Sequence, residues 1–350
     1  MKQQKSLYHT QKMGIPGLTN VIKNSAPESM ETHNISYLSE KRVAIDMSLV
    51  TYQCLISLRF KSGGFMDSEG NTTSHLYGIF NRFTEYLRLG LIPIGVFDGK
   101  PPDAKKKTIA SRNKDATESR EKIKLLKEGP QTLEIKQKIM DLEKKSVRMT
   151  WQQGEDLKIL LKLMGIKTYQ ANGEAEAACV WLVKHDKADT IMTEDMDTLV
   201  YGAPELIRRN VHRGSPPDEI VVFKLDKILE GLELTMEQFV DMCLLCGSDY
   251  TSSIPRIGSR TAHTNLVKYK TLAKTLEILR AKPNAVSIPT DAEYKIAKDI
   301  FTVENNELIY NDQLEFDTIE PNIVKLKSYL LSKNFNEKRV NTAIKKAYKL

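Results

Sequence analysis

Short β-rich runs alternate with segments of helical periodicity along this chain, and this alternation limits the fold more than any other feature of the sequence. The runs cover 42–46, 92–98, 166–169, 190–192, 206–208 and 220–223. The helical segments cover 47–59, 74–89, 150–164, 174–185 and 235–246. Strands separated by helix-length segments predict an α/β fold, with a mostly parallel twisted sheet flanked by helices on both faces.

Acidic residues follow the ends of these strands and helices. The set consists of Asp46, Asp98, Glu174, Glu176, Asp195, Asp197 and Asp249. Because sites in parallel sheets form beyond the carboxyl ends of the strands, we expect these acids to converge on one crevice. Each acid also has an ordinary alternative. Asp46 and Asp98 could cap the following helices, and the two glutamates could sit in a helix first turn that favours negative charge.

Seven carboxylates in one crevice would repel one another strongly unless cations neutralise them. Oxygen ligands with no converging His or Cys select Mg²⁺ or Mn²⁺ rather than zinc. A cluster of this size can hold two such ions about 4 Å apart, an arrangement suited to hydrolysis of a phosphodiester. The sequence therefore predicts a metal-dependent site for a phosphate-containing substrate.

A basic segment carries the whole excess of positive charge. Between Lys100 and Arg148 there are 15 Lys or Arg and 8 Asp or Glu, which equals the formal net charge of +7 for the chain. Two helices, roughly 104–127 and 132–147, are predicted on either side of Gly129-Pro130. Their apolar stripe is thin, so we expect them to project from the body and to gain order with a polyanion. A solvated helical surface is the alternative.

The four cysteines predict no disulfide framework and are typical of a reducing compartment. Cys243 and Cys246 have metal-site spacing but lie in an apolar helical run without a second pair, so we interpret them as core residues. No run of about 18 apolar residues predicts a membrane span, and the first twelve residues lack the apolar core of a secretory signal.

Six motifs, in this order, resemble the motif series of the flap endonucleases, which are structure-specific 5′ nucleases. They are Met13-Gly-Ile-Pro-Gly-Leu18, Val43-Ala-Ile-Asp46, Val96-Phe-Asp-Gly-Lys-Pro-Pro102, Gly173-Glu-Ala-Glu-Ala177, Thr193-Glu-Asp-Met-Asp197 and Gly247-Ser-Asp-Tyr250. The resemblance runs from about residue 13 to residue 345. It implies that the seven acids bind two Mg²⁺ ions, for which Mn²⁺ can substitute.

The resemblance also implies roles for individual residues. Lys105 and Arg112 match a basic pair that polarises the scissile phosphate, so the catalytic set becomes Lys105, Arg112, Asp46, Asp98, Glu174 and Asp197. Tyr52 matches an aromatic on which an unpaired base stacks; a core position is its alternative. Thr73 matches part of a pocket for a one-nucleotide 3′ flap. Further DNA contacts are implied at Gly14, Arg59 and Arg82.

The family's helix–two-turn–helix element, which grips duplex DNA, would lie at about 235–268. Arg256, Gly258 and Arg260 are its expected DNA contacts here. Arg256 stands where the family has the first of two glycines, which weakens the expectation of a potassium ion at this element, although the arginine could add a phosphate contact.

The resemblance implies a division of the chain into parts. Residues 1–12 are an extension expected to be disordered, because the family begins at the position of Met13; an unused start codon is the alternative. A nuclease region covers 13–115 and continues over 149–270, with the helical gateway and cap at 103–148 between them. A C-terminal helical part, 271–350, packs on the core. A sliding clamp stays an open partner, although the peptide with which family members bind it does not occur before Leu350.

The function implied is hydrolysis of a phosphodiester near a single-strand/duplex junction of branched DNA with a 5′ flap, during replication and repair. The protein is expected to be a monomer, nuclear in a cell or at a cytoplasmic replication site in a virus. A 5′–3′ exonuclease is one alternative. A repair or junction-resolving enzyme is another, although the interval between Asp98 and Glu174 is too short for the repair branch's spacer. A non-catalytic DNA-junction-binding protein is the alternative from a different class.

Overall fold

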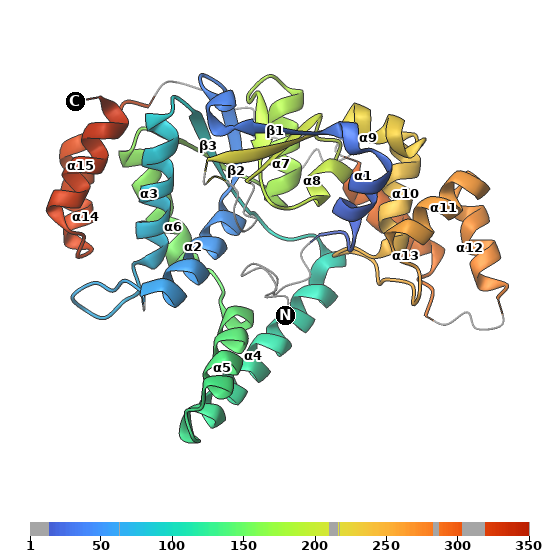
Figure 1. The fold of residues 1–350 in the computed structure, drawn as a ribbon, viewed down its shortest axis with the longest axis horizontal. Coiled ribbons are helices and arrows are strands. Elements are labelled where there is room, and N and C mark those ends of the chain that lie inside the picture. Colours follow the sequence, from blue (N-terminus) through green and yellow to red (C-terminus); the bar gives the residue numbers. More distant parts are fainter. Residues whose placement is uncertain are drawn as a thin grey trace.

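The computed structural model describes residues 14–62, 64–209, 216, 218–282, 287–302 and 319–349. A seven-stranded sheet forms its centre, in the order β1-β7-β6-β5-β2-β3-β4 (Figure 1). The strands are β1 (Met30–Asn34), β2 (Arg42–Asp46), β3 (Ile92–Phe97), β4 (Lys167–Gln170), β5 (Thr190–Met192), β6 (Glu205–Arg209) and β7 (Glu219–Lys224). Strands β4, β3, β2, β5 and β6 pair in parallel, whereas β7 pairs antiparallel with β6 and β1.

The predicted α/β class and the mostly parallel sheet are confirmed. All six predicted runs are strands, and their ends shift by no more than one residue. Strand β1 was not predicted, because its sequence Met-Glu-Thr-His-Asn is not rich in β-forming residues. It joins the sheet at its edge by pairing with β7.

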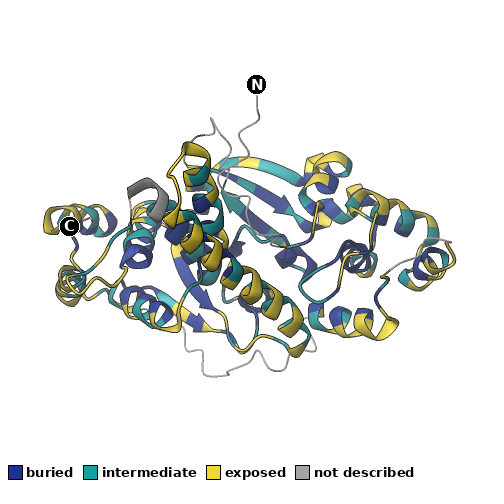
Figure 2. Cartoon of the chain, turned by 90° about the horizontal axis from the view of Figure 1, so that it is seen from below, coloured by how far each residue is buried: buried dark blue, intermediate teal, exposed yellow. Residues whose placement is uncertain are grey.

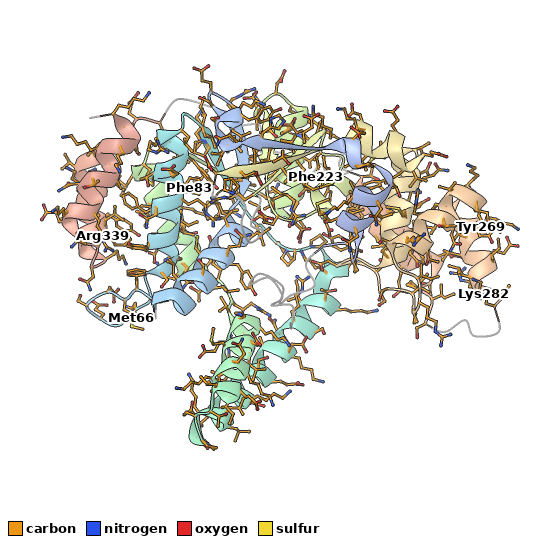
Figure 3. The ribbon with its side chains drawn as sticks, viewed as in Figure 1. Met66, Phe83, Phe223, Tyr269, Lys282 and Arg339 are labelled. Carbon is orange, nitrogen blue, oxygen red and sulfur yellow. The ribbon has the colours of Figure 1, made fainter. Side chains whose placement is uncertain are left out.

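Alternate residues of the strands feed two hydrophobic cores, one on each face of the sheet. Val43 and Ile45 enter one core, while Ala44 between them enters the other. The Val43 face packs on α2 (Met47–Ser62), α3 (Ser74–Arg88), α6 (Trp151–Leu163), α14 (Ile323–Ser332) and α15 (Glu337–Tyr348). The opposite face packs on α1 (Leu18–Ser25), α7 (Ala175–Lys184), α8 (Asp197–Val200), α9 (Leu225–Leu232) and α10 (Met236–Cys246). Figure 3 labels Phe83 of the first core and Phe223 of the second.

Helices α11 (Ser259–Tyr269), α12 (Leu272–Arg280) and α13 (Asp291–Phe301) extend the second core beyond α10. Cys243 and Cys246 are buried within α10, which confirms their interpretation as core residues. No helix among the described residues is long and apolar enough to cross a membrane. The expectation of disorder for 1–12 falls outside the described residues.

Two helices project from the body as a hairpin, which we call the helical hairpin (Figure 1). It consists of α4 (Lys106–Glu128) and α5 (Leu133–Ser146), preceded by a 3₁₀ turn at Asp103–Lys105. The predicted helices and their break are confirmed. Few of its side chains are buried, and its outer faces are exposed (Figure 2). The two helices pack mainly against each other, as the thin apolar stripe predicts.

The connection between α10 and α11 contains a strained turn. The backbone N–H of Ile257 donates to the carbonyl of Ile254 at 3.0 Å, and Pro255 and Arg256 form the corner. Arg256 has a φ of +66°. Proline at the second position and positive φ at the third are features of a type II turn, which favours glycine at that third position. The backbone therefore keeps the geometry for which glycine is suited, although the residue is arginine.

We expect Arg256→Gly to stabilise the protein, because glycine adopts positive φ without a Cβ clash. The expected gain is roughly 0.5–1 kcal/mol after glycine's greater freedom in the unfolded chain is counted. Arg256→Ala is the matched control, since it removes the same charge but keeps the strain. Denaturant titration of the three proteins measures the effect. A glycine variant no more stable than the alanine variant would contradict the proposed strain.

Candidate active site

The central strands bring the acidic residues to one edge of the sheet. Asp46 is the last residue of β2, and Asp98 follows β3, its parallel neighbour. Strand β5 lies on the other side of β2 and leads through Thr193 to Asp195 and Asp197. Since these three parallel strands end together, their acids face one crevice.

A backbone contact brings the glutamates to the same place. The N–H of Gly99 donates to the carbonyl of Gly173 at 2.7 Å, which joins the loop after β3 to the loop before α7. A Cβ at Gly99 would lie 2.1 Å from the carbonyl oxygen of Ala171, so this approach requires glycine. Glu174 is the N-cap of α7 and Glu176 lies in its first turn. Oxygens of Asp98, Glu174 and Glu176 consequently lie within 4.8 Å of one another.

Capping of the following helix, the ordinary alternative, holds for Asp46 together with its place in the cluster. It does not hold for Asp98, which bonds to α7 rather than to the helix that follows it in the chain. Asp46 accepts hydrogen bonds from the backbone N–H groups of Ser48 and Leu49 at the start of α2, as a capping residue does. Asp98 accepts from the N–H of Ala175 at 2.8 Å, in the first turn of α7. These bonds orient both carboxylates.

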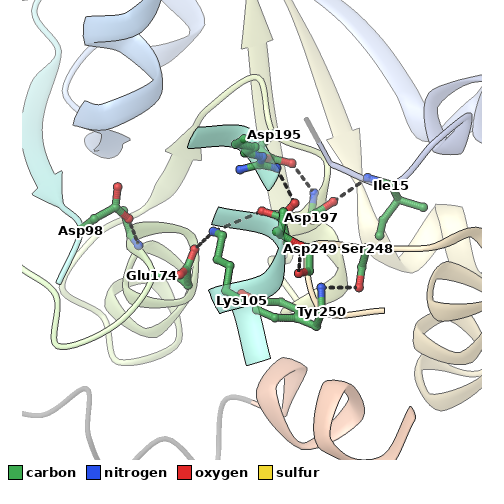
Figure 4. Close-up of polar contacts among 12 residues, drawn as sticks. Ile15, Asp98, Lys105, Glu174, Asp195, Asp197, Ser248, Asp249 and Tyr250 are labelled. Atoms are coloured by element: carbon green, nitrogen blue, oxygen red, sulfur yellow. Dashed lines mark hydrogen bonds and ion pairs between the residues drawn. The ribbon is translucent and has the colours of Figure 1, made fainter. Parts of the chain in front are cut away.

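The last two acids of the β5 loop accept hydrogen bonds from backbone donors, one from a distant segment and one from the loop itself (Figure 4). The N–H of Ile15 donates to Asp197 at 2.8 Å, and the N–H of Asp197 donates to Asp195 at 3.0 Å. Gly14 has a φ of +69°, and a Cβ there would lie 2.6 Å from an oxygen of Asp195. The segment before α1 therefore lies directly against the acid cluster, and glycine is required at its point of contact.

The helical hairpin contributes the counter-charges. Lys105 makes an ion pair with Glu174 and lies 3.2 Å from Asp249 (Figure 4). Arg112 makes an ion pair with Asp249. Thr108, one turn after Lys105, donates its hydroxyl to the carbonyl of Asp249 at 2.7 Å. Lys105, Thr108 and Arg112 therefore present one face of the hairpin's base to the acids.

Burial and mutual repulsion raise the pKa values of several acids in the cluster. Burial, with repulsion from Asp98, raises the pKa of Asp46 to about 8. Burial likewise raises the pKa of Glu174, and it raises those of Glu176 and Asp197 well above the usual range. Although burial alone lowers the pKa of Lys105, Glu174 and neighbouring acids raise it overall. The crevice therefore carries a deficit of positive charge that Lys105 offsets only in part.

These residues fit a hard divalent cation. The described ligand atoms of the cluster are carboxylate oxygens, which Mg²⁺, Mn²⁺ and Ca²⁺ prefer. The raised pKa values show that the carboxylates are short of neutralising charge, which such a cation supplies.

The predicted DNA-contact residues lie outside the cluster, apart from Gly14. The hydroxyl of half-buried Tyr52 donates to the carbonyl of Lys144 at 3.0 Å. Buried Thr73 is the N-cap of α3, and Arg82 donates to the side-chain oxygen of Gln53 at 3.1 Å. The remaining contacts lie at or near the start of α11, where Arg256, Gly258 and Arg260 are exposed. The side chain of Arg59 is outside the described part of the structure.

Three features of the site have no counterpart in the sequence prediction. Thr108 could have been found from its helical spacing between Lys105 and Arg112. Tyr250 belongs to the motif that carries Asp249, and its hydroxyl lies 2.8 Å from that of Tyr201. Burial, with the charge of Glu174, raises the pKa of Tyr250, so its hydroxyl stays protonated beside the acids. The backbone N–H of Ile15 leaves no sequence signal.

Comparisons with known proteins agree with this geometry. The XPG N-terminal domain matches residues 13–119, and the XPG I-region matches residues 165–249. Flap endonuclease 1-A of Sorghum bicolor is 39% identical over 339 residues, covering 95% of this chain and 86% of that protein. Flap endonuclease 1 of Entamoeba histolytica is 37% identical over 336 residues, covering 95% and 87%.

Solved structures share the fold. Flap endonuclease-1 from Methanococcus jannaschii superposes with a TM-score of 0.66 at 25% identity, covering 91% of this chain and 95% of that one. The catalytic core of Rad2 in complex with DNA substrate superposes with a TM-score of 0.70, covering 95% and 99%. Its identity of 19% supports a common fold alone. The sequence relatives decide the family, and the chain is a member of the flap endonuclease family.

Proposed function

We propose that this protein hydrolyses a phosphodiester bond of branched DNA near the junction between a 5′ single-strand flap and duplex. One observation carries the proposal: acids from distant parts of the chain meet in one crevice, and Lys105 and Arg112 enter that crevice from a basic helical hairpin. Family membership supports the same chemistry. Buried carboxylates that repel one another lower folding stability, and DNA binding without catalysis does not require them.

The acids would hold two divalent cations, Mg²⁺ in the first instance. Their ligands would be drawn from Asp46, Asp98, Glu174, Glu176, Asp195, Asp197 and Asp249. Such cations supply positive charge to the attacking and leaving oxygens of the phosphodiester. The backbone bonds to Asp46, Asp98 and Asp197 fix the ligands before the ions arrive, so little reorganisation is needed on binding.

Lys105 and Arg112 would bind the scissile phosphate and stabilise the negative charge that develops on it. Their present partners are Glu174 and Asp249. Lys105 and Arg112 would be free to bind phosphate oxygens in the same crevice if their carboxylate partners served as cation ligands. The hairpin beyond them carries the excess positive charge of the chain and would hold the single strand.

The flanking DNA would lie along the face that includes α2, α3 and the start of α11. Tyr52, Arg59, Thr73 and Arg82 would contact it on one side of the crevice. On the other side, the exposed Arg256 and Arg260 would meet phosphates at the glycine-led start of α11. Backbone contacts of this kind recognise shape rather than base sequence. The strained turn at Arg256 places a side-chain cation where the family has glycine, and potassium binding there stays a secondary proposal.

A cleavage assay on a labelled 5′-flap duplex with Mg²⁺ tests the proposal. We expect product near the junction from the wild-type protein and none from Asp197→Asn, whose amide removes one negative charge with little change of shape. Lys105→Ala should lower the single-turnover rate by about 10²–10³-fold, as the loss of a charge-stabilising donor does. Lys106→Ala is the matched control, because that neighbouring lysine is exposed and pairs with Asp103.

An intact flap after incubation with wild-type protein, or equal cleavage by Asp197→Asn, would end the proposal. Blunt duplex run in parallel separates the exonuclease alternative. A 5′–3′ exonuclease releases short products from both duplexes, whereas a flap endonuclease releases the flap as one fragment.

Divalent cations should also stabilise the fold in a pH-dependent way. The folded pKa of Asp46 is about 8, well above its ordinary value, so the folded state binds its proton more tightly than the unfolded state. The stability from this group is therefore present at low pH and lost as pH rises from about 4 towards 8. Ca²⁺ or Mg²⁺ should restore it by binding the folded state.

We expect the thermal midpoint to rise with added Ca²⁺ by several degrees at pH 8, and by much less at pH 5.5. Asp46→Asn removes one of the repelling charges, so its midpoint in EDTA should vary less with pH than that of the wild type. Scanning fluorimetry measures both. A midpoint that is indifferent to cations at both pH values would argue against a metal site in this crevice.

A further inference from the structure

The helical hairpin is anchored to the body at two separate places. The first anchor is the acid cluster, where Lys105, Thr108 and Arg112 contact Asp249 and Glu174. The second lies at the far end of α5, where the chain returns to the body. Since α4 and α5 pack mainly against each other, these anchors set the direction in which the hairpin projects (Figure 1).

The second anchor combines a small apolar contact with one polar bond. Leu55 and Ile56 of α2 pack with Val147, just after α5, in a cluster separate from the two large cores, and Tyr52 packs against it. The hydroxyl of Tyr52 donates to the carbonyl of Lys144 at 3.0 Å, across 92 positions of sequence. Tyr52 therefore packs against this small cluster and contacts the hairpin itself through its hydroxyl.

The bond reaches a carbonyl in the last turn of α5. The last four carbonyls of an α-helix accept no hydrogen bond from an N–H of the same helix. Side chains, water or other segments donate to them instead. At the end of α5, Arg148 donates to the carbonyl of Lys145 at 3.1 Å and Arg120 donates to that of Ser146 at 3.4 Å. Arg120 and Arg148 belong to the hairpin and its return segment, whereas Tyr52 belongs to the body.

A further bond connects this end of the hairpin to the catalytic face. Arg148 also donates to the carbonyl of Arg112 at 3.0 Å, so the end of α5 and the base of α4 share one guanidinium. A shift of the α5 end would pass through Arg148 to Arg112 in α4 and on to Lys105, the N-cap of that helix. A misplacement of about 1 Å at a charge-stabilising group can lower the reaction rate by about 10²-fold.

We propose that the Tyr52 hydroxyl is a positioning group. It holds the end of α5 against α2 and, through Arg148, keeps Arg112 and Lys105 in register with the carboxylates. This role is distinct from base stacking, which would use only the aromatic ring, and it rests on the proposed nuclease function. Removal of the hydroxyl should therefore loosen the hairpin and slow the chemical step without weakening the hold on DNA.

Tyr52→Phe tests this, because it removes the hydroxyl and keeps the ring. Tyr329→Phe is the matched control: its hydroxyl also donates to a backbone carbonyl, that of Asp156 at 3.2 Å, but within the body. Hydrogen exchange is measured first without DNA. Tyr52→Phe should speed exchange across 133–147 by up to about fivefold, which is the effect expected from the loss of one hydrogen bond of ordinary strength. Tyr329→Phe should leave exchange across 133–147 unchanged.

Single-turnover cleavage of a saturating 5′-flap duplex is measured next. Tyr52→Phe should lower the rate by about three- to tenfold while the affinity for DNA stays within about twofold, and Tyr329→Phe should change neither. In an Arg148→Ala background the effect of Tyr52→Phe should shrink to less than about twofold, because that variant removes the guanidinium that joins the end of α5 to the carbonyl of Arg112. A purely structural role would give equal effects in both backgrounds.

The outcomes separate this proposal from the one on which it rests. If wild-type protein cuts no flap, the nuclease proposal fails, and hydrogen exchange still reports whether the hydroxyl holds the hairpin. If wild-type protein cuts but Tyr52→Phe matches it in exchange or in rate, the positioning role is overturned. A full rate effect that persists in the Arg148→Ala background also overturns it.

Discussion

Electrostatic repulsion among buried carboxylates is the constraint on which the rest of this structure depends. Strands β2, β3 and β5 end at one edge of the sheet, and the acids that follow them cannot avoid one another. The repulsion is offset where the helical hairpin inserts Lys105 and Arg112 between Glu174 and Asp249. The same repulsion among carboxylates therefore limits the stability of the crevice and favours positive charge within it.

This constraint links the hairpin to the chemistry. Because α4 and α5 bury few side chains, packing alone does little to fix the direction in which the hairpin projects. Its base is fixed by ion pairs with the acids, and the end of α5 is fixed by Tyr52. Cations and phosphate would compete for the first set of contacts and leave the second in place. The hairpin could then exchange partners in the crevice while keeping its attachment to α2.

The strand runs, the two hairpin helices and the acids beyond the strand ends were all predictable, because each depends on local periodicity or on the rule that parallel strands end together. Strand β1 was not, since its polar residues form a strand only by pairing with β7. The bond from Tyr52 to Lys144 was likewise hidden, because it joins residues 92 positions apart. The departure at Arg256 was visible in the sequence, but its positive φ was not.

By itself, the sequence determined the α/β class and the presence of acidic residues beyond the strand ends, since these follow from residue type and from alternation along the chain. Only the tertiary structure decided how the charges are balanced. It placed the N–H of Ile15 on Asp197, paired Lys105 with Glu174, and seated Thr108 on the carbonyl of Asp249. Such contacts depend on distances between segments far apart in the chain, and local sequence patterns carry no information about those distances.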